Sequence, residues 1–167
     1  MLTMTRAMLW KIILPIAAIG TPFTAAAQTA PAGAPQAALV EYRVVGDGIP
    51  ASLTRNAGDP VAGRAVIEDR KLGNCLSCHA FPFSAEDPGN IGPDLRGVVG
   101  RMTPAQFRLR LVNMKVLDPQ TIMPAYYRVA GLRDVSRAFA GKPILTAQQV
   151  EDVVAFLAST TSTGANR

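Results

Sequence analysis

A five-residue stretch, Cys75-Leu-Ser-Cys78-His79, contains both cysteines and the only histidine of this 167-residue chain. The spacing C-x-x-C-H is that of a c-type haem attachment site. One short helical turn would place the two thiols on one side, for thioether bonds to the haem vinyl groups, and would direct the imidazole at the iron. The sequence therefore predicts a fold built around a single covalent haem c.

Two other interpretations of these residues stay open. A C-x-x-C pair can be a redox dithiol, which usually accompanies a βαβ pattern, and the flanking segments show no such pattern. A zinc site needs about four ligands, and only Cys75, Cys78 and His79 offer soft donors. A dithiol or metal-binding protein without haem is thus the alternative from a different class, and the motif also occurs by chance.

The first 27 residues have the features of a secretory signal peptide. Arg6 and Lys11 supply positive charge, residues 12–20 form an apolar run, and residues 25–27 are alanines that suit a cleavage site. The run is shorter than the ~20 residues of a membrane span, so cleavage is favoured over an uncleaved anchor. Because haem is joined to its thiols outside the cytoplasm, we expect a periplasmic protein with no membrane span after cleavage.

Removing 27 residues from 167 leaves 140, about one domain. The chain has 17 Lys and Arg against 12 Asp and Glu, and the leader takes two of the basic residues, so the mature charge is 15 minus 12, or +3. This charge is too diffuse to indicate nucleic-acid binding, and it suits either an acidic partner or an ordinary solvated surface. We expect an N-terminal extension over residues 28–57, a haem domain over 58–160 and a C-terminal tail over 161–167.

The first predicted helix leads into the haem motif. Asp59 is a good N-cap and Pro60 a good first helical residue, and the helix is expected to run to Lys71. Gly63 lies inside it at a cost of ~1 kcal/mol relative to Ala. That glycine indicates either a close helix crossing or a tolerated weakness.

Two more helices follow. Thr103-Pro104 opens one, and Thr146 with Gln149 forms a capping box at the start of the other. The apolar stripe of the last helix, at i, i+3, i+4 and i+7, is Val150, Val153, Val154 and Leu157. Residues 39–44 contain a short β-like run, and residues 116–145 form an unusually long loop of a size that is often functional. The whole predicts an all-α protein.

The sixth ligand of the iron is sought among the methionines. After the leader only Met102, Met114 and Met123 remain, and methionine ligation raises the haem potential. Met102 precedes a helix and Met114 closes one, which suits packing. Met123 lies in mid-loop, where Pro124 biases it toward an extended backbone. We expect Met123 and His79 to be the axial ligands, with loop packing as the alternative for Met123.

The stretch after the haem motif would support His79. A ligating histidine generally donates its other ring N–H to a carbonyl or carboxylate. The stiff Gly92-Pro93 turn could present such a carbonyl, and Leu95 could close the haem edge. A plain surface turn is the other interpretation.

Residues 58–158 resemble a class I c-type cytochrome in their capped helix, haem motif, Gly92-Pro93-Asp94-Leu95 turn, Met-Pro strap and closing helix. More specifically, residues 40–158 are similar to the SoxX family of monohaem cytochromes. Besides the motif, the stretches that carry the similarity are Gly58-Asp-Pro-Val-Ala-Gly63, Arg108-Leu-Arg-Leu-Val112, Thr121-Ile-Met-Pro-Ala-Tyr-Tyr-Arg128 and Phe139-Ala-Gly-Lys-Pro-Ile-Leu-Thr-Ala-Gln-Gln-Val-Glu-Asp-Val-Val154.

The resemblance implies a complex with the haem subunit SoxA, which joins thiosulfate oxidatively to a cysteine of the carrier SoxYZ (L-cysteine S-thiosulfotransferase). In that family the catalytic haem, with its modified cysteine ligand, belongs to SoxA. This chain has no cysteine beyond Cys75 and Cys78, so it is expected to be a non-catalytic subunit that relays electrons to a downstream cytochrome or oxidase. A free-standing periplasmic cytochrome c shuttle is the alternative.

Overall fold

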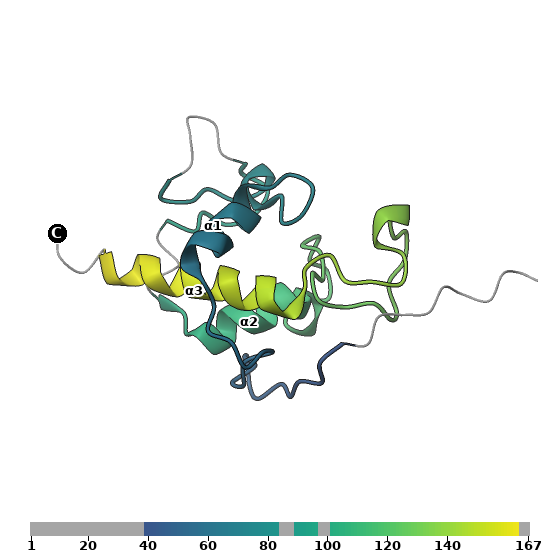
Figure 1. The fold of residues 1–167 in the computed structure, drawn as a ribbon. Helices are drawn as coiled ribbons and strands as arrows, with labels where there is room; N and C mark the ends of the chain where they lie inside the picture. Colours follow the sequence, from purple (N-terminus) through teal and green to yellow (C-terminus); the bar gives the residue numbers. More distant parts are fainter. Residues whose placement is uncertain (1–38, 84–88, 97–100, 164–167) are drawn as a thin grey trace, which may run out of the picture. The chain divides into compact units, whose positions relative to one another are not determined.

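The computed structural model describes residues 39–83, 89–96 and 101–163, and the predicted signal peptide lies outside them. Three α-helices, α1 (Pro60–Glu68), α2 (Pro104–Asn113) and α3 (Ala147–Thr163), carry the fold (Figure 1). Three single 3-10 turns join them, namely η1 (Cys75–Ser77), η3 (Met114–Val116) and η4 (Arg137–Phe139). The described residues contain no strand, which confirms the predicted all-α class.

The start of α1 is confirmed, and its end comes earlier than predicted. The carboxylate of Asp59 accepts a hydrogen bond from the Val61 N–H at 2.8 Å, and Pro60 is the first helical residue. The helix ends at Glu68 rather than Lys71, because Asp69 leaves helical geometry and accepts hydrogen bonds from the chain that turns back behind it. This turn delivers the chain to the haem motif.

Gly63 marks a close crossing of α1 and α3. A Cβ placed on Gly63 would overlap the backbone carbonyl of Asp152 in α3, and one placed on Gly58 would overlap the carbonyl of Glu151. The side chain of Asp152 also accepts a hydrogen bond from the Asp59 N–H at 2.9 Å. The crossing predicted from Gly63 is therefore confirmed, and the glycine is required by the close approach of two backbones.

The other two helices begin at capping boxes. At the start of α3 the Thr146 N–H donates to the Gln149 side chain at 2.9 Å, and the Gln149 N–H donates to the Thr146 hydroxyl at 3.2 Å. Thr103 and Gln106 make the same reciprocal pair at the start of α2. The fully buried residues at the centre of the core come from all three helices and the segments beside them: Ile49, Ile67, Leu109, Val112, Leu145, Val150 and Val153.

The β-like run predicted in residues 39–44 is wrong. The only β-type pairing in the described chain is an isolated bridge between Val45 and Gly48, which closes a turn. The N–H groups of this region instead bind the domain: Val40 donates to the Tyr127 hydroxyl and Ile49 to the Ala105 carbonyl, both at 2.9 Å. Leu39 and Tyr42 pack against the core, whereas Val40 and Val44 are exposed.

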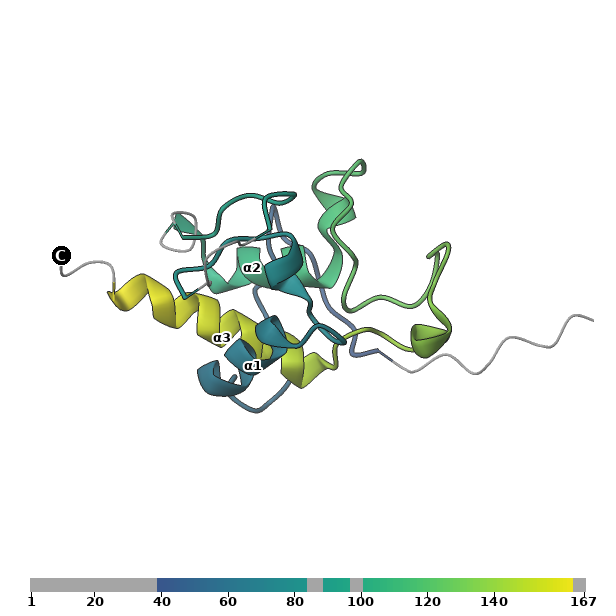
Figure 2. The same ribbon diagram turned by 90° about the horizontal axis from the view of Figure 1, so that it is seen from above.

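The long loop before α3 contains a segment with little burial. Every residue from 128 to 144 is exposed or only partly buried. The hydrogen bonds within it are local, for example from the Phe139 N–H to the Ser136 carbonyl at 2.9 Å. In Figures 1 and 2 the part that carries η4 lies to the side of the three helices. The helical core therefore contributes little to holding this segment.

Candidate cofactor site

A tight loop sets the geometry of the Cys75–His79 stretch. Asn74 adopts the left-handed conformation with φ 48°, which turns the chain into η1. The N–H groups of Cys78 and His79 both donate to the Cys75 carbonyl, at 3.1 and 2.9 Å. The predicted short helical turn is present, and it brings the two thiols and the imidazole to one cavity.

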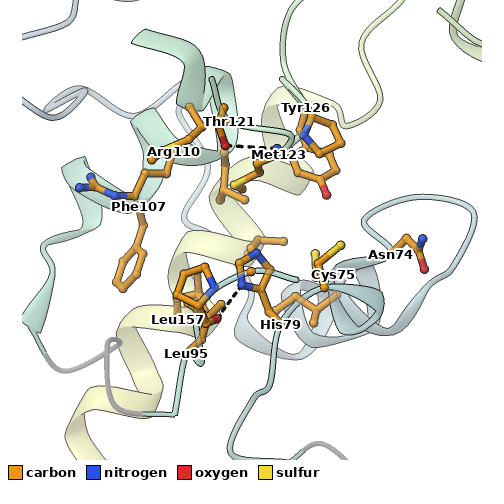
Figure 3. A pocket seen from close by; sticks show the side chains of 18 of the residues that line it. Asn74, Cys75, His79, Leu95, Phe107, Arg110, Thr121, Met123, Tyr126 and Leu157 are labelled. Atoms are coloured by element: carbon orange, nitrogen blue, oxygen red, sulfur yellow. Dashed lines mark hydrogen bonds between the residues drawn. The ribbon is translucent and has the colours of Figure 1, made fainter. Parts of the chain in front are cut away.

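The cavity has a volume of about 280 Å³ and an apolar wall built from all three helices. It is lined by every residue that the sequence assigns to the site: Cys75, Cys78, His79, Pro93, Leu95 and Met123. Figure 3 shows Met123 and His79 facing each other from opposite sides of the cavity, with Cys75 at one edge. Ile67, Phe107 and Leu157 contribute to the apolar remainder.

The imidazole of His79 is fixed from behind. Its Nδ1 lies 2.8 Å from the Pro93 carbonyl oxygen (Figure 3), so Nδ1 carries the proton and Nε2 is left as a lone-pair donor. Gly92 makes this approach feasible, because a Cβ there would lie 2.7 Å from Nδ1 and closer still to the neighbouring ring carbon. The Gly92-Pro93 turn thus does what the sequence predicts, and a side chain at Gly92 would push the ring away.

A second close contact keeps this turn against the haem motif. The Gly89 and Gly92 N–H groups donate to the carbonyls of Leu76 and Cys78, at 3.0 and 2.8 Å. Leu95 follows with a hydrogen bond to the Ala80 carbonyl at 2.9 Å. The backbone that presents the Pro93 carbonyl is therefore bonded at three points to the segment that carries His79.

All three methionines of the described residues line the cavity. Met114, which the sequence assigns to helix packing, is only partly buried and contributes to the cavity wall, as does Met102. The Met123 N–H donates to the Thr121 hydroxyl at 3.2 Å, and Lys115 donates to the Thr121 carbonyl at 2.8 Å. Local hydrogen bonds thus hold the loop around Met123. Because all three thioethers line the wall, lining the cavity does not by itself identify one of them as the iron ligand.

Arg110 and Tyr126 are among the wall residues that were not predicted. Arg110 is the only Asp, Glu, Lys or Arg side chain of the wall, and it lies across the cavity from Cys75 in Figure 3. Tyr126 is buried, and its hydroxyl donates to the Gly73 carbonyl at 2.8 Å. The approach of Arg110 to the cavity and the hydrogen bond of Tyr126 both depend on segments that are distant in sequence. The only sequence signal for Tyr126 was its position three residues after Met123.

Burial controls the protonation of this edge of the cavity. Desolvation raises the pKa of the Cys75 thiol to about 11, and a hydrogen bond with the Tyr126 hydroxyl offsets only part of this effect. Desolvation, together with the nearby cysteines, also raises the pKa of Tyr126 above its ordinary value of 10.0. Both groups are therefore protonated at neutral pH, and the Tyr126 hydroxyl is available as a donor.

The residues present fit a covalent c-type haem. Two thiols lie at the edge, an imidazole offers Nε2, a thioether faces it, and the wall is apolar. In such a haem, histidine and methionine are the usual iron ligands, and two cysteines form thioether bonds to the vinyl groups of the porphyrin. Within the described residues, no cluster of three or more His, Cys, Asp and Glu side chains is arranged to hold a metal ion by itself.

The helical fold and the donor set define a class I cytochrome c-like protein. No protein-family model matches the chain, and no curated protein matches it. Among solved structures the chain is similar to a chain of the crystal structure of SoxXA from P. pantotrophus, with 40% identity over 72% of this chain and 95% of that chain and a TM-score of 0.66. The protein belongs to the SoxX family.

One further property concerns membranes. Among the helices of the described residues, none combines the length and apolarity of a transmembrane span.

Proposed function

We propose that this protein is the monohaem electron-transfer subunit of a SoxXA-type complex. The observation that carries the proposal is the pairing of Met123 with His79 across an apolar cavity whose edge holds Cys75 and Cys78. Similarity at 40% identity to a chain of SoxXA supports the complex. The leader and the haem motif together support export to the periplasm, where attachment takes place.

Each residue of the site has a definite task. Cys75 and Cys78 hold the haem covalently, and the haem supplies one-electron redox chemistry. His79 would bind the iron through Nε2 while the Pro93 carbonyl fixes its ring. Met123 would supply a thioether to the iron, and Leu95 with the apolar wall would exclude water. Exclusion of water lowers the local dielectric and so adjusts the potential.

The role in the complex is that of a relay. In the SoxX family that this chain resembles, the pair joins thiosulfate to a cysteine of SoxYZ and the catalytic haem belongs to SoxA, which supports this role. This chain contains no cysteine other than Cys75 and Cys78, so it offers no third thiolate to a catalytic iron. We infer that it accepts the electrons released and passes them to a downstream cytochrome or oxidase.

A free-standing cytochrome c shuttle is the second candidate. It uses the same cavity and differs only in its partners. The segment 128–144 favours the complex, because 17 residues with no buried side chain are more than a simple shuttle needs and offer a face to a partner.

Copurification followed by haem counting separates the candidates. The tagged protein, expressed in the periplasm of its native host, should copurify with a second haem subunit. Its mass should exceed that of the polypeptide alone by one covalent haem. Deletion of the gene should abolish growth on thiosulfate. Isolation as a monohaem monomer, with thiosulfate growth intact, would establish the shuttle instead. Absence of covalent haem would overturn both candidates in favour of a dithiol or metal-binding protein.

A further inference from the structure

A buried tyrosine joins the two segments that meet at the cavity. Tyr126 ends the strap, defined here as residues 121–126, which carries Met123. Its hydroxyl donates to the carbonyl of Gly73, 53 residues earlier, at 2.8 Å. Gly73 lies two residues before Cys75, in the loop that leads into the haem motif. The hydroxyl therefore connects the methionine side of the cavity to its cysteine side.

The backbone of Tyr126 is held just as firmly as its side chain. Its N–H donates to the Leu111 carbonyl in α2 at 3.1 Å, and its carbonyl accepts from the Leu145 N–H at 3.0 Å. The other attachments of the strap are local, such as the bond from Met123 to Thr121. Pro124 provides no N–H, and Ile122 is 77% exposed. The remaining hydrogen bonds of the strap join it to residues 115–121 just before it. Tyr126 thus makes the hydrogen bonds that fix the strap to distant parts of the chain.

Gly73 is closely confined as well. A Cβ on this residue would lie 2.6 Å from the Val66 carbonyl and 3.0 Å from the Cys75 sulfur. Its carbonyl consequently has a fixed direction, set by the end of α1 and by the cysteine that follows. A hydrogen bond to such a rigid acceptor transmits position, because neither end can move without breaking it.

We propose that Tyr126 is a positioning residue that locks the Met123 strap to the Cys75 attachment loop. The inference rests on the proposed function, since it assumes haem in the cavity with Met123 as its ligand. With the lock closed, the thioether stays opposite His79. Without it, the Gly73 carbonyl is left buried and unpaired, and the closed strap loses stability relative to an open one.

The adjacent tyrosine provides a matched control. Tyr127 is also buried, at 3% exposure, and its hydroxyl also makes one backbone hydrogen bond, accepting from the Val40 N–H at 2.9 Å. That bond ties the N-terminal extension to the domain and does not reach the attachment loop. Tyr126→Phe and Tyr127→Phe therefore remove the same atom from neighbouring residues, and only the first opens the lock.

The test measures how easily an added ligand displaces the methionine from the ferric holoprotein. Imidazole should bind Tyr126→Phe about tenfold more tightly than wild type, which is the factor expected for one buried hydrogen bond. The absorption band of the methionine–iron bond should weaken in parallel. Tyr127→Phe should lose comparable thermal stability, yet keep imidazole affinity within about twofold and retain the band.

The outcomes distinguish this inference from the proposed function. Equal imidazole affinity in wild type and Tyr126→Phe, or an equal increase in both variants, overturns the lock while leaving the electron-transfer function intact. A wild-type protein that carries haem but lacks the methionine–iron band overturns both the lock and the assigned ligand. Circular dichroism of both variants verifies that each retains the helical fold.

Discussion

Arg108 in α2 and Glu151 in α3 form a buried bidentate ion pair across 43 residues of sequence, with Nε–Oε1 at 2.7 Å and Nη2–Oε2 at 2.8 Å. Their side chains are only 7% and 6% exposed. The same pair holds the N-terminal extension, because Arg108 also donates to the Ile49 carbonyl and Glu151 accepts from the Leu53 N–H. One charge pair thus joins two helices to the segment that precedes α1.

Removal of one partner should destabilise the fold strongly. Glu151→Gln leaves the Arg108 guanidinium buried without its carboxylate, which typically costs about 3–5 kcal/mol. The free energy of unfolding, measured by urea denaturation, should fall by that amount. Glu68→Gln is the control, because Glu68 and Arg64 form an exposed i,i+4 pair that contributes about 0.5 kcal/mol or less. Equal losses in both variants would contradict the assignment.

The same pair predicts the response to acid. Burial alone would raise the pKa of Glu151, but hydrogen bonds from Arg108 and the Leu53 N–H outweigh it and hold the pKa below the ordinary value of 4.5. The stabilisation is therefore present above pH 4.5 and is lost as the pH falls through the lower folded-state pKa. Wild type should lose stability more steeply than Glu151→Gln below pH 4.5, as recorded by thermal unfolding across a pH series.

The crossing at Gly63 should not tolerate a methyl group. Gly63→Ala would drive a Cβ into the backbone carbonyl of Asp152 and force α1 away from α3. We expect a loss of about 1–3 kcal/mol, in spite of the better helix propensity of alanine. Val61→Ala in the same helix, at a residue 77% exposed, should change stability by less than about 0.5 kcal/mol. An unchanged or raised melting temperature for Gly63→Ala would refute the close packing.

The three methionines of the cavity wall can be separated by one series of variants. Met123→Leu should lose the methionine–iron absorption band and lower the reduction potential, because a thioether ligand favours the reduced iron. Met102→Leu and Met114→Leu keep a similar volume and should retain the band. Loss of the band in either of those variants, with Met123→Leu unaffected, would assign the ligand to another wall residue.

Arg110 should raise the reduction potential of the bound haem. It is the one permanently charged side chain of the wall, and a nearby cation opposes the extra positive charge of ferric iron. Its partial exposure, 29%, and the carboxylate of Asp47 at 3.9 Å reduce the effect. Arg110→Gln should lower the potential by some tens of millivolts, about 1 kcal/mol. Arg64→Gln, outside the wall, should leave it unchanged, and a matching shift there would indicate a nonspecific charge effect.

The features predicted correctly from sequence are those that local physics determines. Asp59 and Thr146 cap helices through atoms within three residues, and the Gly92-Pro93 turn follows the haem motif closely enough for its stiffness to be informative. Gly63 indicated a helix crossing, because a glycine in a helix interior lowers stability unless close packing requires it. Its partner, Asp152, could not be identified from the sequence.

The features that were missed depend on long-range packing. The bond from Tyr126 to Gly73 spans 53 residues, and the approach of Arg110 to the cavity depends on how α2 is rotated. The alternation in residues 39–44 was interpreted as a strand, but only Leu39 and Tyr42 pack against the helical core, and Val40 and Val44 are exposed. Met114 was assigned to packing because it lies at the end of a helix. That helix end also forms part of the cavity wall.

The packing of α1 has a consequence for the order of events during biosynthesis. Among the described helices α1 packs on α3 and on η1, and α3 lies at the far end of the chain. On the proposed function, a chain exported from its N-terminus presents both thiols to the periplasm before α3 arrives to pack on α1. An enzyme that joins haem to Cys75 and Cys78 in that interval would meet accessible thiols and not a finished cavity.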